Sequence, residues 1–307
     1  MKFFDIPILF LIFNKPETSL RVFSEIRKVK PKKLYIGCDG PRNFIKNESH
    51  KVLSLQESII NQIDWDCEVK TFFRDTNYGC RIAVSDAITW FFNSEEKGII
   101  LEDDCLPCES FFNFSKHMLK KYENDYKIWH ISGTNLFSEQ KIKGDYYFSK
   151  IPLIWGWATW ASRWKHYHEK RQSFNSNGMK VIRNLFNRKE ASFWYKTISN
   201  SHNIDAWDAD WAFCCFSNKG YSIQPKKNLI SNIGFGDEAR TTKDIDHELA
   251  SLETFELLEP YDFNKEMLYI GESLDSQTMR TFFSISFKKT IQRKIKSIYK
   301  RLRKHEK

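Results

Sequence analysis

Three consecutive acids, Glu102, Asp103 and Asp104, follow a short apolar run at residues 98–101. Such a run is typical of a buried strand in a parallel sheet. Open α/β sheets bind their ligands beyond the carboxyl ends of the strands, where the three acids fall. Adjacent carboxylates repel one another, and a divalent cation such as Mn²⁺ or Mg²⁺, which prefers oxygen ligands, would remove that repulsion. The acids indicate either a cation-binding site or a solvated acidic turn.

A second acidic cluster, residues 205–211, alternates acids with aromatic side chains. Asp208 and Asp210 lead into an apolar helical segment at residues 211–216. A carboxylate fixed beside a tryptophan could serve as a general base. Acids in the first turn of a helix are also favoured by the helix dipole without any catalytic role. The residues alone leave both interpretations open.

A tryptophan-rich segment contains Trp155, Trp157 and Trp160, and a further tryptophan, Trp207, lies in the second acidic cluster. Aromatic faces stack against the apolar C–H faces of sugar rings, so these side chains are candidates for contact with a sugar or an acceptor. Large aromatic side chains also dominate protein cores. A tryptophan-rich core layer is therefore the alternative.

The first part of the chain alternates strands with amphipathic helices. We expect strands at residues 6–13, 33–38, 67–74 and 98–101, and helices at 16–28, 49–63 and 81–93. This alternation predicts a parallel sheet with right-handed crossovers. Asn14 and Asp39 directly follow the first two strands, and Asn77 follows the third. No GxxxxGK[ST] loop occurs and no GxGxxG follows the first strand, which disfavours P-loop and dinucleotide-binding proteins.

The later part of the chain is less regular. We expect a helix at 109–122, strands at 127–131, 146–149, 221–224 and 228–233, and a loop with glycine hinges at 234–243. Arg240 and Lys243 are cations near the end of that loop. Loops of this composition are often mobile and close over ligands.

The charge of the chain is concentrated at one end. The net charge is +9, but residues 286–307 hold ten Lys or Arg and one acid, so residues 1–285 are balanced. A neutral body argues against an extended nucleic-acid interface. The seven cysteines show no disulfide framework, which favours a reducing, cytoplasmic environment.

The whole set of motifs resembles a known family. It consists of IPILFLIFNKP, CDGPR, NYG, IILEDDCLP with a following Phe-Phe, ISGTN, WGWATW and WDADW, in this order over roughly residues 4–245. The chain resembles GT-A fold nucleotide-sugar glycosyltransferases, and among them bacterial relatives of the α-mannoside β-1,2-N-acetylglucosaminyltransferase I type. The resemblance implies a Rossmann-like, mostly parallel sheet flanked by helices, at residues 1–275. Residues 1–104 would form the nucleotide-binding half and residues 105–275 the acceptor half.

The resemblance also implies roles for individual residues. The last acid of the triplet, Asp104, would bind the metal, with Glu102 and Asp103 near the ribose and sugar. Asp39 would contact the base, and Arg81 lies near a nucleotide-contacting position. The acid before the last Trp of WDADW, Asp210, would be the catalytic base. An Ala separates the two acids of this sequence, so Asp208 stays a rival for that role. The closing loop would bring Arg240 and Lys243 over the donor, completing a predicted nucleotide-sugar site with Asn14 and Asn77.

The resulting hypothesis is a metal-dependent, inverting transferase. It would move a sugar from a nucleotide-diphosphate sugar, such as a UDP-sugar, to a glycan or lipid-linked acceptor of a bacterial surface polysaccharide. Two alternatives stay open: another metal-dependent nucleotidyltransferase, and a non-catalytic carbohydrate-binding protein. The first would need a basic phosphate clamp, and no such run occurs in residues 1–285. The second has no need for both acidic clusters.

The basic end of the chain, residues 276–307, has helical periodicity. Apolar residues recur every three or four positions, at Phe283, Phe287, Ile291, Ile295, Ile298 and Leu302. This predicts a basic amphipathic helix, which would bind an anionic membrane surface. We therefore expect a peripheral location on the inner face of the plasma membrane. A nucleic-acid-binding arm or a helix docked on protein are the alternatives.

Overall fold

The computed structural model describes residues 3–137, 144–201, 203–236, 244, 247–257, 271–281 and 283. Within these ranges, one sheet contains eight strands in the order β3-β2-β1-β4-β8-β6-β9-β7. The strands are β1 (Ile8–Ile12), β2 (Lys33–Cys38), β3 (Glu68–Phe73), β4 (Lys97–Glu102), β6 (Ile128–Ser132), β7 (Tyr146–Ser149), β8 (Trp157–Trp160) and β9 (Tyr221–Pro225). A separate antiparallel pair joins β5 (Cys105–Pro107) to β10 (Ile230–Asn232).

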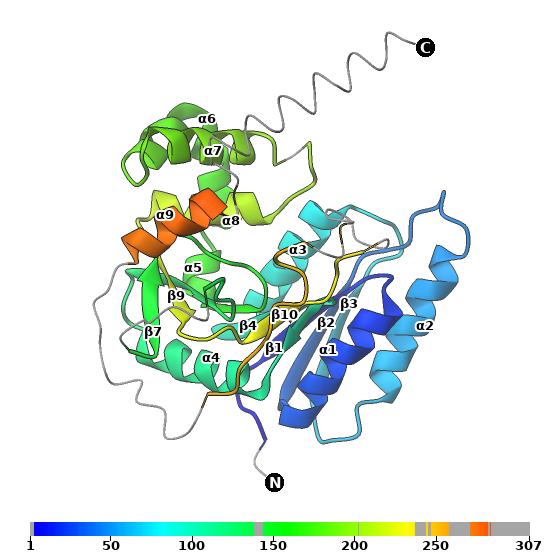
Figure 1. Cartoon of the computed structure of the whole chain (residues 1–307). Coiled ribbons are helices and arrows are strands. Elements are labelled where there is room, and N and C mark those ends of the chain that lie inside the picture. The colour runs from blue at the N-terminus through cyan, green and yellow to red at the C-terminus, as the bar shows by residue number, and fades with distance from the viewer. Residues whose placement is uncertain are drawn as a thin grey trace.

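The four strands β3-β2-β1-β4 form a continuous parallel half of the sheet. Their connections are α1 (Pro16–Val29), α2 (Glu48–Asn61) and α3 (Cys80–Phe92), as the sequence predicts. Residues along β1 alternate between two cores, because successive side chains of a strand point to opposite faces. Ile8 and Phe10 share one core with residues of α1 and α2, whereas Leu9 and Leu11 share the other with α3. Figure 1 shows α1 and α2 side by side beside the strands.

The other half of the sheet is mixed. The strand β8 runs antiparallel to both of its neighbours, β4 and β6, and β6 pairs in parallel with β9. The tryptophan-rich segment thus contributes a central strand that the sequence did not predict. α4 (Glu109–Lys121) and the short α5 (Ala161–Trp164) flank this part. α4 shares the core of α1 and α2 through residues such as Phe111 and Met118.

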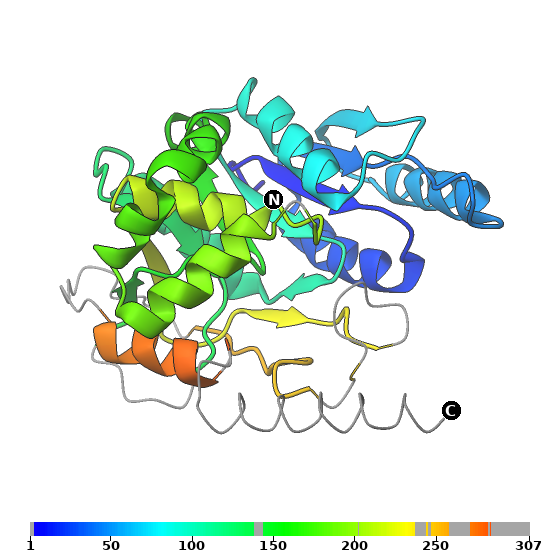
Figure 2. The same cartoon turned by 90° about the horizontal axis from the view of Figure 1, so that it is seen from above.

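A helical layer packs against the mixed half. It consists of α6 (Tyr167–Arg183), α7 (Arg188–Ser199), α8 (Asp208–Ser217) and α9 (Glu272–Thr281), whose apolar side chains form a core of their own. Figure 2 shows these helices gathered at one side of the molecule. The sequence predicts α8 but not α6 or α7. The predicted domain boundary at residue 275 falls inside α9, in which Met279 is buried.

The observed architecture is the α/β class that the sequence predicts, with a large, mostly parallel, Rossmann-like sheet flanked by helices. Within the described ranges, every helix is too short or too polar to cross a bilayer. Most of the predicted basic amphipathic helix, including all residues from 284 onward, lies outside the described residues.

Candidate functional site

The candidate site lies where the strand order of the parallel half reverses. After β1 the chain builds β2 and β3 on one side and then β4 on the other, so the carboxyl ends of β1 and β4 enclose a topological switch point. Open α/β sheets bind ligands in the crevice at such a point. A cavity of about 800 Å³ opens there, lined by residues that follow β1, β2 and β4. Its size is that of a pocket for a small-molecule ligand.

The three acids after β4 all line this cavity, and a lysine lies among them. Lys15 Nζ is 2.8 Å from Asp104 Oδ2 and 3.8 Å from Asp103 Oδ1. The backbone N–H of Phe13 donates to Asp103. Since β1 and β4 are neighbours in the sheet, the residues that end β1 meet those that end β4. The acid cluster is therefore a cavity wall and not a solvated turn.

Burial raises the pKa values of two of the acids in this wall. Burial raises the pKa of Glu102 to about 8, and the negative charges of Asp104, Asp103 and Asp208 add to the shift. Burial also raises the pKa of Asp103 to about 7, although the charge of Lys15 opposes the change. Burial lowers the pKa of Lys15, but the surrounding carboxylates outweigh it and the pKa is raised well above its usual value. A single lysine leaves the cluster with excess negative charge.

Asp39, at the end of β2, supports the turn that follows β3. It accepts hydrogen bonds from Asn77 Nδ2 (2.9 Å), from the backbone N–H of Tyr78 (3.0 Å) and from the backbone N–H of Gly79 (3.0 Å). Asn77 Nδ2 also donates to the carbonyl of Gly40 at 2.8 Å. Burial raises the pKa of Asp39, against these donors. Both Asp39 and Asn77 line the cavity, and they also join the loop after β2 to the loop after β3.

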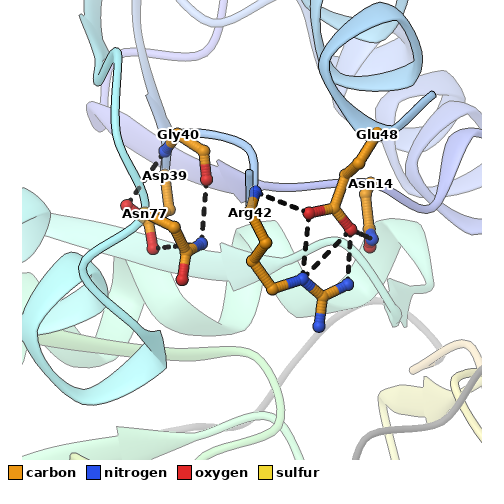
Figure 3. A network of polar contacts seen from close by, with 6 residues as sticks. All are labelled: Asn14, Asp39, Gly40, Arg42, Glu48 and Asn77. Carbon is orange, nitrogen blue, oxygen red and sulfur yellow. Dashed lines mark hydrogen bonds and ion pairs between the residues drawn. The ribbon is translucent and has the colours of Figure 1, made fainter. Parts of the chain in front are cut away.

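A second network in the same wall is built around Glu48 (Figure 3). Glu48 is buried and accepts from Asn14 Nδ2 at 2.6 Å, from the backbone N–H of Arg42 at 2.7 Å, and from the Arg42 guanidinium. The Arg42 side chain lowers the pKa of Glu48. Asn14 and Arg42 line the cavity. Glu48 thus fixes a polar pair, from the ends of β1 and β2, at the cavity wall.

The second acidic cluster splits into three different environments. Asp205 accepts from the backbone N–H groups of Cys80 at 2.7 Å and Arg81 at 3.0 Å, and so caps the N-terminus of α3. A side chain at Gly79 would approach Asp205 Oδ2 to 2.9 Å, and the backbone there has φ of +83°, a conformation that suits glycine. This contact ties the segment before α8 to α3, which connects β3 to β4 in the parallel half of the sheet.

Asp208 and Asp210 diverge within the first turn of α8. Asp208 lines the cavity, and its charge acts on Glu102. Asp210 is 1 % exposed, accepts from Ser201 Oγ at 2.9 Å and lies 3.0 Å from Arg171 Nε of α6. It does not belong to the cavity lining. The buried ion pair does not suit the base predicted at Asp210, and the geometry favours the rival Asp208.

The four tryptophans also divide. Trp155 and Trp207 line the cavity, although Trp207 is only 2 % exposed and packs in a core. Trp157 and Trp160 were wrongly predicted to stack on a sugar, because both are buried in the cores. The ring of Trp157 stacks on that of Trp207 at 5.7 Å, and Trp160 Nε1 donates to the carbonyl of Leu119. The segment therefore supplies core tryptophans at 157 and 160, and a cavity side chain at 155.

The predicted cations are less well placed. Arg81 contributes its backbone N–H to Asp205, and its side chain is not among those that line the cavity. Arg240 and Lys243 lie outside the described residues. The start of their loop does reach the site: Gly234 and Phe235 line the cavity, and Phe235 meets Trp155 edge-to-face at 6.1 Å.

Sequence reasoning missed Lys15, Arg42, Glu48 and Asp205. Lys15 and Arg42 follow strands directly, as the predicted residues do, so strand-end position was an available signal. Glu48 and Asp205 act through long-range contacts, to Asn14 and to α3 respectively. No spacing in the sequence marks such contacts.

The residues at the cavity suit a divalent cation. In the described chain, no group of three or more His, Cys, Asp or Glu is arranged to hold a metal ion by itself. Mg²⁺ in nucleotide sites usually takes only one or two carboxylates and completes its coordination with phosphate and water. The acid wall offers hard oxygen donors, and repulsion among these acids adds to the rise that burial causes in the pKa of Glu102 and Asp103. Asp104 and its neighbours therefore fit the cation.

Comparisons with known proteins give little further guidance. No family model and no curated protein sequence matches the chain. Among solved structures, UDP-glucose pyrophosphorylase complexed with UDP-glucose is similar with a TM-score of 0.36 and 11% identity, over 72% of this chain and 90% of that one. The 4-diphosphocytidyl-2C-methyl-D-erythritol synthase of Anaerococcus prevotii gives 0.33 and 9%, over 71% and 88%. Similarity this low carries no argument about function.

Proposed function

We propose that the protein is a glycosyltransferase that transfers a sugar from a nucleotide-diphosphate sugar, such as a UDP-sugar, to a hydroxyl acceptor. The observation that carries the proposal is the convergence of both acidic clusters on one cavity: Glu102, Asp103 and Asp104 from β4, and Asp208 from α8. One cluster suits the cation of a nucleotide diphosphate and the other a general base. A protein that only binds carbohydrate needs neither.

The cavity has walls of two kinds, which suit the two parts of such a donor. Asn14, Asp39 and Arg42 lie at the ends of β1 and β2 and offer polar contacts for a nucleoside. Trp155 and Phe235, both partly exposed, offer aromatic surface in the same cavity as Asp208, where a sugar and its acceptor would stack. The sugar-bearing end of the donor is thereby assigned to the α8 side.

Asp208 is the proposed base. Its carboxylate would take the proton of the acceptor hydroxyl while the acceptor oxygen forms a bond to the anomeric carbon. The bond from that carbon to the phosphate oxygen breaks, and the nucleoside diphosphate leaves with the electron pair. Attack from the face opposite the leaving group inverts the anomeric centre.

A divalent cation, Mn²⁺ or Mg²⁺, held by Asp104 would act as a Lewis acid that offsets the charge growing on the leaving diphosphate. Glu102 and Asp103 would orient the ribose and sugar hydroxyls through hydrogen bonds. Arg240 and Lys243, if their loop closes, would add positive charge and exclude water.

The test is a product assay with a panel of nucleotide sugars and Mn²⁺, first without acceptor. A thermal-shift screen selects the donor that stabilises the protein. Slow release of nucleoside diphosphate supports the proposal. Release of sugar 1-phosphate instead, with transfer of the nucleotidyl group to added pyrophosphate or to water, would identify a nucleotidyltransferase. Binding without turnover, with or without sugar acceptors, would identify a binding protein.

We also propose that the acceptor is lipid-linked and that the basic end of the chain, residues 286–307, holds the enzyme at an anionic membrane surface. Each cation near such a surface contributes about 1 kcal/mol. Liposome flotation of the full chain and of a chain ending at residue 285 tests this at low and high salt. Flotation that is equal for both chains, or independent of anionic lipid, contradicts it.

A further inference from the structure

Lys15 differs from the other cations that line the cavity. Arg42 is held by Glu48, and Arg74 lies 2.6 Å from Asp86; neither Glu48 nor Asp86 is among the lining residues. Lys15 is paired with Asp104 and Asp103, which do line it. Its partners are thus the oxygens that a divalent cation would use.

Asp104 has little freedom to serve two cations at once. Its Oδ2 accepts from Lys15 at 2.8 Å. A Cβ at Gly234 would approach the same Oδ2 to 2.1 Å, so the backbone of residue 234 also lies close to this oxygen. The backbone N–H of Ile233 donates to the carbonyl of Asp104 at 2.8 Å, which anchors this arrangement. A cation that takes Oδ2 must displace the ammonium group of Lys15.

The backbone of Lys15 is fixed while its side chain is long. The Lys15 carbonyl accepts from the backbone N–H of Ser19 at 3.0 Å and from Ser19 Oγ at 2.6 Å, at the start of α1. A lysine side chain carries a compact charge on a flexible four-carbon stem. Its ammonium can therefore change partner within the cavity without any change of the fold.

We propose that Lys15 is an exchangeable counter-ion, which holds Asp104 when the site is empty and transfers to the diphosphate of the donor when the divalent cation takes Asp104. This inference rests on the proposed function. Binding of the cation and of the nucleotide is then cooperative. The cation alone must break the bond between Lys15 and Asp104, and the nucleotide alone must take Lys15 from Asp104 or bind without it. It also assigns Lys15 as a phosphate-contacting residue that no motif in the sequence marked.

Metal binding without nucleotide gives the sharpest test. We expect Lys15→Met, which keeps an unbranched side chain and removes the ammonium group, to bind Mn²⁺ alone about tenfold more tightly than the wild type, because no charge-assisted hydrogen bond has to be broken. Titration of Mn²⁺ followed by its electron paramagnetic resonance signal measures this. A merely structural lysine predicts the reverse, since its loss would disorder the acids and weaken Mn²⁺ binding. Unchanged or weaker Mn²⁺ binding by a folded Lys15→Met protein overturns the proposal.

Nucleotide binding gives the second readout. With saturating Mn²⁺, calorimetric affinity of Lys15→Met for UDP, or for the diphosphate of the donor selected above, should fall about tenfold, and Lys15→Arg should restore most of it. Lys33→Met, which removes a cation paired with Glu95 away from the cavity, is the matched control and should change neither affinity. If the wild type binds no nucleoside diphosphate, the proposed function fails, whereas the Mn²⁺ titration still judges the exchange at Asp104.

Folding of the variant needs its own safeguard. Removing Lys15 leaves three adjacent acids uncompensated, so Lys15→Met will melt at a lower temperature in the absence of Mn²⁺. The double variant Lys15→Met/Asp104→Asn relieves that repulsion and should recover stability. It should also lose the tenfold gain in Mn²⁺ affinity, since the second substitution removes the carboxylate of Asp104 that the loss of Lys15 makes available. Retention of the gain in the double variant would contradict the role assigned to Asp104.

Discussion

The two acidic clusters of this chain have similar composition and opposite organisation. In residues 102–104 the acids converge on one cavity and share Lys15. In residues 205–210 each acid has a separate environment: Asp205 caps α3, Asp208 lines the cavity, and Asp210 is buried against Arg171 of α6.

Backbone geometry explains the difference. The first cluster stands at the carboxyl end of a parallel strand. The parallel strands beside it end at the same edge of the sheet, so the residues that follow these strands lie close together. Asp208 and Asp210 begin a helix, in which side chains two positions apart do not share a face. One of the two can face the cavity only if the other faces the helical layer. Two acids in the first turn of a helix thus supply one carboxylate to the cavity, whereas adjacent acids at the end of a strand supply several.

The strongest test of this contrast is Asp208→Asn. We expect transfer turnover to fall by about 10²–10⁴-fold, the usual contribution of a positioned general base. Donor binding should be nearly unchanged, because Asp208 acts on the acceptor hydroxyl. Steady-state kinetics with soluble acceptor, together with calorimetric donor affinity, separate the two. Turnover near that of the wild type would remove Asp208 from the mechanism.

The companion variant, Asp210→Asn, should affect stability and not chemistry. It leaves Arg171 beside a neutral amide in a buried pair, and we expect about 3 kcal/mol of destabilisation in urea, the lower end of the range for a broken buried pair. The lower end applies because the Arg171 side chain keeps 20% of its exposure. Turnover of the folded fraction should match the wild type. A fall of 10²-fold or more in a folded Asp210→Asn protein would restore Asp210 as the base.

The buried side of α8 should also give the molecule a pH dependence. Trp211 Nε1 donates to His130 Nδ1 at 3.1 Å, so the other ring nitrogen, Nε2, carries the proton and donates to the carbonyl of Leu153 at 2.9 Å. Burial lowers the pKa of His130 to about 3. Below about pH 6.5 the unfolded chain binds a proton there that the folded chain does not. The contribution of His130 to the free energy of unfolding should therefore fall with falling pH, by up to about 1.4 kcal/mol per pH unit.

Urea unfolding between about pH 7 and pH 5 measures that slope. His130→Gln removes the titrating ring, so its stability should change less over this interval, whatever its absolute value. Equal slopes for the variant and the wild type would show that His130 is not held neutral.

The smallest expected effect concerns Asp205, the remaining acid of the second cluster. Asp205→Ala removes the acceptor for two backbone N–H groups of α3, and we expect a loss of about 1 kcal/mol, typical of a helix cap. Asp205→Asn keeps an acceptor oxygen and should lose less. Urea unfolding compares the two, and a larger loss for Asn than for Ala would contradict the capping role.

The sequence was informative where apolar periodicity and strand ends coincide. The second strand was predicted at residues 33–38 and is observed there, and the first helix was predicted at 16–28 and extends to Val29. Parallel strands bring their carboxyl ends together, so Asn14, Asp39 and Asp104 could be assigned to one edge before the structure was known. All three line the cavity.

The rest depends on partners far away in the chain. The segment containing Trp157 and Trp160 is apolar on both sides, so its pattern does not distinguish a central strand from a ligand-binding surface. α6 is mostly polar, and its few buried residues are too sparse to mark a helix in the sequence. Without α6 and its Arg171, nothing in the sequence separates Asp210 from Asp208. Lys15 meets Asp104 only because β4 pairs with β1. The order of strands in the sheet determines this contact, and the spacing of residues in the sequence does not reveal it.

The cap that Asp205 places on α3 has a consequence for observing this protein at work. The amide hydrogens of Cys80 and Arg81 donate to a residue more than a hundred positions away, three residues before Asp208. Their exchange with deuterated solvent is slow only while that segment is seated against α3. Two backbone amides at the start of α3 thus report, without any label, whether the segment that carries Asp208 is in place.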